Sequence, residues 1–321
     1  MTVVAGVLRV FLLALCVVAV AGLWAERWWV AELLVSLRVQ QVCVLVPVLL
    51  LSMVARMSRW WRLCAVLLLC WHLWWLRTAW RAEGPSADLT LPAARLTVCV
   101  ANVQADNPDV ASVVGSLRAC DADVIAVLEL TRALRIRLSG EFAESHPYFL
   151  WEEREPGHFG IGLLSRLPIR SSAIVNYRLP SVPSIEAELE LPGGGVVQLI
   201  ATHPRPPMDA WQHRMRNEHL GVLGDRVAEL RGAGGLPVIV VGDLNVTPWS
   251  PTYGRFQERG GLWSATAGGG LEPTWYQRPG FLYGLVLDHV LHTDGVRCAG
   301  RRILSGNGSD HRPVLTEFQI E

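Results

Sequence analysis

The chain has 321 residues, a mean hydropathy of +0.28 and 29 basic against 29 acidic residues. This length allows one sizeable domain plus a further segment, and zero net charge excludes a strongly basic chain, the type usual among polyanion-binding proteins. Charge is uneven, because residues 1–94 carry 8 Arg and 4 acids whereas residues 95–321 carry 21 Arg and 25 acids. We therefore expect a membrane anchor at residues 1–82, a linker at 83–94 and a separate domain at 95–321.

The first segment contains three apolar runs. They cover residues 3–24, 39–55 and 60–79, each close to the roughly 17–25 residues that cross a bilayer. Tryptophans gather at the ends of these runs, as amphipathic rings do at a lipid–water interface. We therefore predict three transmembrane helices and a lipid bilayer as partner; the alternative is a buried helical hairpin of a soluble domain.

The orientation of these predicted spans follows from the short loops. Arg56, Arg59 and Arg62 lie between the second and third runs with no acid among them, which places this loop in the cytoplasm. The sequence predicts a multi-pass cell-membrane protein with residues 95–321 outside the cytoplasm, although Arg77 and Arg81 favour the opposite orientation. Residues 19–21 resemble a signal-peptidase site, but the apolar runs that follow favour an uncleaved anchor.

The second domain mixes strand and helix patterns. Residues 96–103 alternate as a strand does, and Asn107-Pro108-Asp109 predicts a helix start with Pro at its first position. Further strands are predicted at 124–128, 160–164, 185–191, 196–202, 237–241, 286–291 and 313–318, and further helices at 130–138 and 209–231. This order predicts an α+β or α/β sandwich with the helices outside.

Polar residues stand where three of these strands end. Asn102 and Glu129 each terminate an apolar run, where a carboxylate can bind a hard cation; a solvated acid at a strand end is the alternative. His203 precedes a proline-rich loop that contains Arg205, and such a stiff loop suits an anionic substrate. His203 could instead only cap a turn.

Asp243 and Asn245 are two residues apart at the end of a very apolar strand. In extended backbone such residues face the same way, so their carboxylate and amide would converge on one pocket. An Asx turn leading to Pro248 is the simpler structural alternative.

Two more acids lie near the carboxyl end. Asp288 interrupts an apolar strand, where an unpaired carboxylate is unfavourable, so it requires a partner. The loop that contains Asp310 and His311 can supply an imidazole. A histidine oriented by one Asp can transfer a proton while a second Asp holds a cation, and metal-assisted hydrolysis requires both.

These stations occur in an order that resembles the endonuclease/exonuclease/phosphatase superfamily typified by DNase I. The stations are Asn102, Glu129, Thr202-His203, Gly242-Asp243-x-Asn245, Asp288-His289 and Ser309-Asp310-His311. The resemblance covers residues 95–319 and implies a four-layer α/β/β/α sandwich. It also implies Mg²⁺ as cofactor, with Mn²⁺ as a substitute.

The resemblance implies a role for each station. Glu129 would be the main metal ligand, with Asn102 and Asp310 close to the cation. His311, oriented by Asp288, would activate water or bind the scissile phosphate. Asp243 and Asn245 would position the nucleophile and the transition-state oxygens, and His203 would contact phosphate or assist the leaving group. Gln104 stands where some members carry an acid.

Three predicted spans ahead of such a domain, together with the motifs Thr-His-Pro-x-Pro-Pro at 202–207 and Gly-Asp-x-Asn-x-Thr-Pro-Trp-Ser at 242–250, resemble the membrane-anchored branch that contains VanJ-type glycopeptide-resistance proteins. This implies a phosphoesterase outside the cytoplasm, acting on a lipid-linked substrate such as polyprenyl pyrophosphate. Two alternatives remain: a membrane-tethered nuclease that hydrolyses DNA, and a non-catalytic binding or sensing module. The charge of −4 on residues 95–321 makes nucleic acid the less favoured partner.

Overall fold

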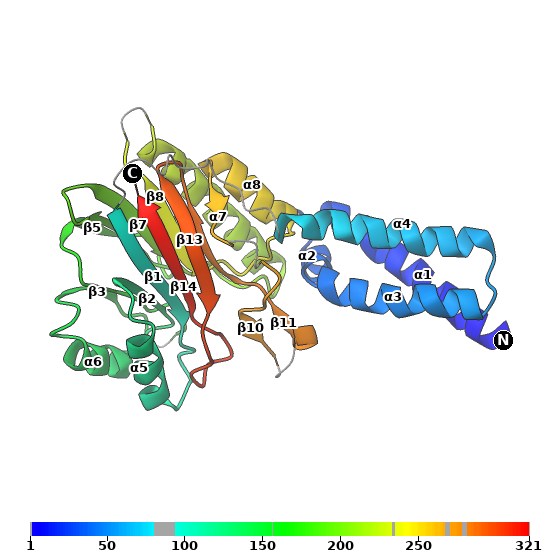
Figure 1. The fold of residues 1–321 in the computed structure, drawn as a ribbon, viewed down its shortest axis with the longest axis horizontal. Coiled ribbons are helices and arrows are strands. Elements are labelled where there is room, and N and C mark those ends of the chain that lie inside the picture. Colours follow the sequence, from blue (N-terminus) through cyan, green and yellow to red (C-terminus); the bar gives the residue numbers. More distant parts are fainter. Residues whose placement is uncertain are drawn as a thin grey trace.

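The computed structural model describes residues 2–79, 94–155, 157–232, 235–266, 270–277 and 281–320, so nearly all of the predicted linker lies outside the described residues. The first segment is helical. Its elements are α1 (Thr2–Ala21), η1 (Gly22–Trp24), α2 (Trp29–Ser36), α3 (Arg38–Val54), α4 (Arg59–Leu76) and η2 (Arg77–Ala79). Figure 1 shows α1, α3 and α4 side by side as a rod projecting from one end of the second domain, with α2 at the junction.

The prediction of three transmembrane helices needs correction. Only Val3–Trp24 is both long and apolar enough to cross a membrane among the described residues. The pair α2 and α3 passes the same test only when taken together, and it bends by 61° between the two helices. Helix α4 contains Arg59, Arg62 and His72 among its 18 residues, which lower its hydropathy. The count is therefore one candidate span, or two with the bent pair.

The second domain contains two six-stranded sheets. The first has the order β13-β14-β1-β2-β4-β3 and the second β5-β6-β7-β8-β12-β9. The strands of the first are β1 (Ala94–Asn102), β2 (Val124–Leu128), β3 (Tyr148–Glu152), β4 (Ile161–Ser165), β13 (Val296–Ile303) and β14 (Val314–Ile320). Those of the second are β5 (Ile169–Val175), β6 (Ser184–Glu190), β7 (Val196–Thr202), β8 (Val238–Asp243), β9 (Trp263–Ser264) and β12 (Asp288–His292). The short strands β10 (Trp275–Tyr276) and β11 (Gly284–Leu285) pair separately.

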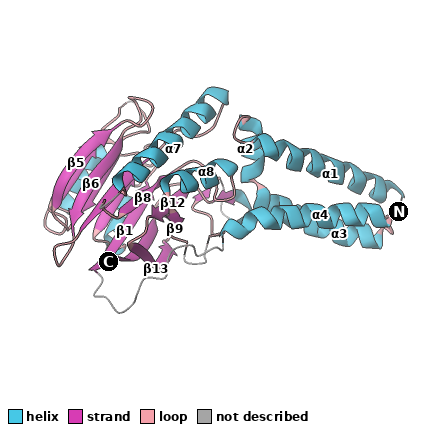
Figure 2. Cartoon of the chain, turned by 90° about the horizontal axis from the view of Figure 1, so that it is seen from above, coloured by secondary structure: helices cyan, strands magenta, loops and turns pink. Residues whose placement is uncertain are grey.

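The two sheets pack face to face with helices outside, as predicted (Figure 2). The central core joins residues from both sheets, including Val100, Leu128 and Val241. Helices α5 (Val110–Ala119) and α6 (Arg132–Glu141) cover the outer face of the first sheet. Helices α7 (Ala210–Leu230) and α8 (Pro251–Gly260) cover that of the second, and η3 (Phe281–Tyr283) precedes β11. This is an α+β sandwich of the DNase I type.

The pairing of the strands brings the predicted polar stations to one end of the sandwich. Strands β1 and β2 run parallel, as do β7 and β8, so their carboxyl ends lie at the same edge of each sheet. In the antiparallel pair β8 and β12, Asp243 lies opposite Asp288. Strand β14 runs antiparallel to β1, so the loop before it, which contains His311, lies at this same end.

The helical segment contacts the domain at this end too. The indole Nε1 of Trp249 donates to the backbone oxygens of Val35 and Ser36, at 3.0 and 3.3 Å. Thr78 donates to the backbone oxygen of Pro248 at 3.2 Å, and Gln40 to that of Gly284 at 3.1 Å. The loop after β8 and the β10–β11 pair therefore lie between the site and the helical segment.

Candidate active site

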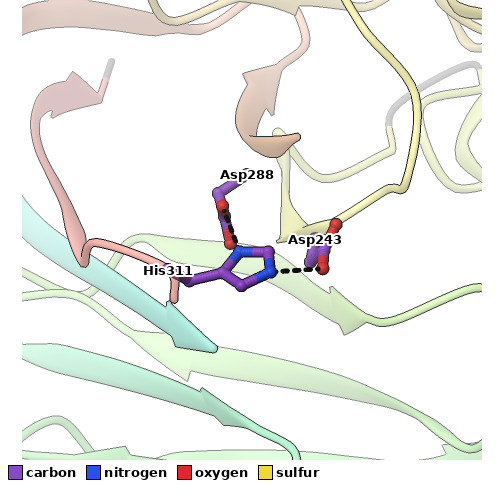
Figure 3. Close-up of side chains that lie close together, drawn as sticks. All are labelled: Asp243, Asp288 and His311. Carbon is purple, nitrogen blue, oxygen red and sulfur yellow. Dashed lines mark hydrogen bonds and ion pairs between the residues drawn. The ribbon is translucent and has the colours of Figure 1, made fainter. Parts of the chain in front are cut away.

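Asp288, His311 and Asp243 form an array held by one hydrogen bond and one ion pair (Figure 3). His311 Nδ1 lies 2.7 Å from Asp288 Oδ2, and its Nε2 lies 3.5 Å from Asp243 Oδ2. All three residues are at most 5% exposed. Thr274 Oγ1 accepts the backbone N–H of Asp288 and so fixes the start of β12. The imidazole is thus oriented by one carboxylate while its other nitrogen faces the second.

The two carboxylates determine the protonation of His311. Burial alone would lower the pKa of His311, but the charges of Asp288 and Asp243 outweigh it and raise that pKa to about 10. Burial likewise acts to raise the pKa of Asp243, yet His311 and His203 lower it to about 2. In this state the array is an imidazolium between two acids.

His203 is a second imidazole on Asp243. Its Nε2 lies 3.5 Å from Asp243 Oδ2, and it is 5% exposed. Although burial opposes it, Asp243 raises the pKa of His203. The side-chain Nδ1 of His203 is buried without a hydrogen-bond partner. One carboxylate oxygen is therefore flanked by two histidines, one directly after β7 and one in the loop before β14.

Asn102 links Asp243 to Glu129. Its Nδ2 donates to Glu129 Oε1 at 3.0 Å and to Asp243 Oδ2 at 3.2 Å, while its Oδ1 accepts from the backbone N–H of Gln104. Glu129 has a φ of 59°, a left-handed conformation that is unfavourable for a non-glycine residue. Gln104 and Asn245 also have positive φ, at 56° and 51°. Such strain gathers at functional sites.

Asp310 lies beside this group. Its Oδ2 accepts from Trp275 Nε1 at 2.9 Å, and its backbone N–H donates to the side chain of Gln104 at 3.2 Å. The side-chain amide of Gln104 therefore holds the loop that contains Asp310. An acid at position 104 would instead add a negative charge beside Asp310. Ser309 donates to the backbone oxygen of Asn102 and accepts the N–H of His311, which ties this loop to the end of β1.

These side chains surround a cavity of about 420 Å³. Its lining includes Gln104, Asp106, Glu129, His158, Phe159, His203, Arg205, Asp243, Asn245, Trp275, Asp310 and His311. Asn102 and Asp288 lie behind this lining, at 1% exposure each. The Arg205 guanidinium lies 4.6 Å from the centre of the Phe159 ring and 5.7 Å from that of Trp211. The structure thus brings all the predicted site residues together, while their individual roles remain predictions.

The donor set fits a divalent cation. Glu129 and Asp310 present carboxylate oxygens to the cavity, and hard cations prefer such ligands. Asp243, Asp288 and His311 also offer ligand atoms within 4.8 Å of one another, the one such group among the described residues. The unpaired oxygen Asp288 Oδ1 is buried there. As oriented here, Asn102 turns its N–H groups toward the acids, so it acts as a brace between them.

Sequence reasoning missed two residues of the cavity. His158 Nδ1 lies 3.2 Å from Glu129 Oε2, and Trp275 fixes Asp310. Both lie in segments whose apolar residues do not recur at strand or helix spacing. Neither residue therefore follows a predicted strand. Trp275 joins His311 in an isolated antiparallel bridge, a contact across 36 residues that spacing alone does not show.

Comparison with known proteins agrees with this geometry. Residues 99–311 match the model of the Endonuclease/Exonuclease/phosphatase family. The chain belongs to this family. No match was found among curated proteins. Membership supports assignment of the chain to the phosphoesterase- and nuclease-type hydrolases.

Several solved structures share the fold. An endonuclease/exonuclease/phosphatase from Beutenbergia cavernae has 20% sequence identity and a TM-score of 0.58, over 71% of this chain and 72% of that one. The human Nocturnin catalytic domain with bound sulfate has 18% identity and a TM-score of 0.59, over 71% and 95%. D. rerio TDP2 complexed with a single-stranded DNA product has 17% identity and a TM-score of 0.58, over 70% and 98%. At these identities the likeness shows the fold.

Proposed function

We propose that the chain is a membrane-attached, divalent-metal-dependent phosphoesterase that acts on a lipid-linked phosphoester outside the cytoplasm. The observation that carries this proposal is the position of the Asp288–His311–Asp243 array. It lies at the end of the sandwich that also contacts the helical segment. A substrate anchored in the bilayer would therefore be close to the reacting groups.

The charges of the cavity support metal dependence. Asp243, Asp288, Glu129 and Asp310 supply four carboxylates, against the imidazoles of His203 and His311 and the guanidinium of Arg205. A phosphate dianion would meet unfavourable charge there without a cation. Glu129 and Asp310 would hold this cation, which we expect to be Mg²⁺ or Mn²⁺. A bound divalent cation offsets charge and polarises a phosphoryl oxygen.

Side chains of the cavity would supply the other catalytic roles. Asp243, with its pKa lowered to about 2, is ionised and can accept a hydrogen bond from an attacking water. His311 and His203, with raised pKa values, can donate to phosphoryl oxygens and to the leaving group. Asp288 keeps the ring of His311 in place. Arg205 and Asn245 are positioned to contact the transferred group.

Membrane attachment is supported by the surface of α1. Val3, Val10 and Val17 are 78, 66 and 68% exposed, and only 17% of the most apolar stretch within Val3–Trp24 is buried. A contiguous exposed apolar face of this kind suits lipid. The other face of α1 packs on α3 and α4 through residues such as Leu12 and Leu45. We therefore propose that α1 is a retained anchor with its amino terminus in the cytoplasm, which leaves residues 95–321 outside.

The lipid-linked substrate also rests on the similarity to VanJ-type proteins, which makes polyprenyl pyrophosphate the first compound to test. A tethered nuclease is the second candidate. One observation favours it, because Phe159 and Trp211 flank Arg205 at the cavity, and aromatic rings beside a guanidinium suit nucleic-acid bases. The charge of −4 on residues 95–321 opposes it.

A direct experiment separates the two. The full chain in detergent is assayed with Mg²⁺ for release of inorganic phosphate from polyprenyl pyrophosphate, and in parallel for nicking of plasmid DNA. His311→Ala serves as the blank in both assays. Phosphate release without nicking supports the proposal, and nicking without phosphate release replaces it with the nuclease. Turnover that persists in excess chelator contradicts metal dependence in either case.

A further inference from the structure

The helical segment carries a carboxylate that an anchor alone does not require. Glu32, in the first turn of α2, is fully buried, and the side chain of Ser250 interacts with its carboxylate. Removing a carboxylate from water is costly unless a countercharge is close. The first question is therefore which group of the catalytic domain faces Glu32.

That group is Arg216 of α7. Its Nη2 lies 3.5 Å from Glu32 Oε1, and the guanidinium is also fully buried. His213, one turn earlier on α7, approaches Glu32 Oε2 at 3.9 Å. The two buried charges come from residues 184 positions apart, so the ion pair forms only when the helical segment is docked on the domain.

Arg216 extends this contact to the catalytic loop. Its Nη1 donates to the backbone oxygen of Asn245 at 2.6 Å. Asn245 holds a left-handed φ of 51°, donates its backbone N–H to Asp243 Oδ1 and donates its side chain to the backbone oxygen of Pro204. One guanidinium thus connects a buried acid of the helical segment to the strained turn that fixes Asp243.

We propose that Glu32 is a positioning residue for hydrolysis, acting through Arg216 on the Asp243–Asn245 turn, so that docking of the helical segment completes the active site. The inference rests on the proposed hydrolytic function. Without the carboxylate, the buried guanidinium has no countercharge and moves toward other acceptors. The Asn245 carbonyl then loses its donor, and a turn with an unfavourable φ relaxes.

The chain contains a matched control. Glu26 also belongs to the helical segment and also pairs with an arginine of the domain, Arg255. Arg255 is 68% exposed in its side chain, and its ion pair makes no contact with the loop after β8. Glu26→Gln therefore removes one carboxylate from the same junction without touching the route to Asn245.

The test uses the full chain in detergent, with bis-p-nitrophenyl phosphate and Mg²⁺. Glu32→Gln is expected to lower kcat by about 10- to 100-fold with KM within about two-fold, since a small misplacement of a reacting group has this effect. Glu26→Gln is expected to match the wild type. Equal kcat values for Glu32→Gln and the wild type would overturn the inference.

A double-mutant cycle shows whether Glu32 acts through Arg216. Arg216→Met is expected to lower kcat on its own, and adding Glu32→Gln to it should lower kcat no further, because the connection is already broken. If the two losses multiply, Glu32 does not act through Arg216. The double variant also removes both members of the Glu32–Arg216 pair, so it keeps the test informative where a single variant folds poorly.

An activity-independent measurement separates this inference from the proposed function. Amide hydrogen exchange at residues 244–249 is expected to be about ten-fold faster in Glu32→Gln and unchanged in Glu26→Gln, since only the former releases the turn. Unchanged exchange in both variants would overturn the positioning role. Lack of any turnover by the wild type would overturn the proposed function, and the exchange result would still decide the inference.

Discussion

Asp288 and its neighbours show how one carboxylate determines what an imidazole can do. Asp288 Oδ2 lies 2.7 Å from His311 Nδ1, and so fixes the ring with its Nε2 toward the cavity. In Asp288→Asn the ring loses both its countercharge and its orientation, and we expect kcat to fall by roughly 10²–10⁴-fold. Steady-state kinetics with Asp294→Asn as control measure this, because Asp294 is an acid just after β12 that pairs with Arg231 on the surface. Equal kcat values for the two variants would contradict the assignment.

The raised pKa of His311 also predicts a pH dependence of stability. The unfolded-state pKa is about 6.5 and the folded-state pKa is about 10. Protonated His311 therefore stabilises the fold fully below pH 6.5, and this contribution is lost as pH rises through 10. In chelator, we expect the Tm of the wild type to fall by several degrees between pH 7 and 10. His311→Gln should show a much smaller fall over the same window, and parallel curves would contradict the raised pKa.

At the level of elements, Gly242 shows how tightly the two parallel strands approach each other beside the site. A Cβ at Gly242 would lie 1.9 Å from the backbone oxygen of Thr202, so β7 and β8 would have to separate next to Asp243. We expect Gly242→Ala to destabilise the fold by about 1–3 kcal/mol and to lower kcat. Gly115→Ala, in the open interior of α5, should instead stabilise it by roughly 0.5–1 kcal/mol. Thermal unfolding of both variants tests these opposite signs.

The strands that sequence patterns identified are the central ones. Strands β2, β4 and β8 are buried throughout, so their apolar runs are visible. Within the two six-stranded sheets, the strands that went unpredicted are β3, β5, β9 and β13, which are the four edges. An edge strand such as β5 is mostly exposed and carries Arg and Ser, which leaves no apolar pattern to read. Helix α5 begins at Val110 with Asp109 as its cap, so Pro108 precedes the helix and does not open it.

The residues of the candidate site likewise divide into those that the sequence identified and those that only the structure shows. Its acids and histidines stand at the ends of central strands, where a buried run followed by a polar residue marks the position in the sequence. The groups that hold them, such as Trp275 on Asp310 and Arg216 on Asn245, come from distant segments. Their partners are set by tertiary packing, and no local spacing encodes it. The prediction of three transmembrane helices was wrong for a related reason, because α4 mixes Trp and Arg with its apolar residues.

At the scale of the whole molecule, the junction between the helical segment and the domain contributes to the stability of the fold. Trp249 is 2% exposed and packs among Ala31, Val35 and Leu76, with its indole N–H on the last carbonyls of α2. Trp249→Phe keeps the apolar packing but leaves those carbonyls without this donor. We expect a loss of about 1–2 kcal/mol, measured by thermal unfolding. Trp263→Phe is the control, since its N–H bonds the partly exposed Asp294, and equal losses would contradict a special role for the junction.

The packing of α1 within the helical segment leads to a prediction about processing and topology. Cleavage after Ala21 would remove the helix whose Leu12 packs with Leu45 and Leu68, and would expose this apolar surface. We therefore expect the mature protein to retain its amino terminus, to resist extraction from membranes by carbonate, and to present a tag after Glu321 to an impermeant reagent in intact cells. Mass spectrometry of the purified chain and surface labelling measure these outcomes, with a tag before Met1 as the protected control. A mass that begins after residue 21 would identify α1 as a signal sequence, and labelling of the tag before Met1 alone would reverse the orientation and place the hydrolytic site in the cytoplasm.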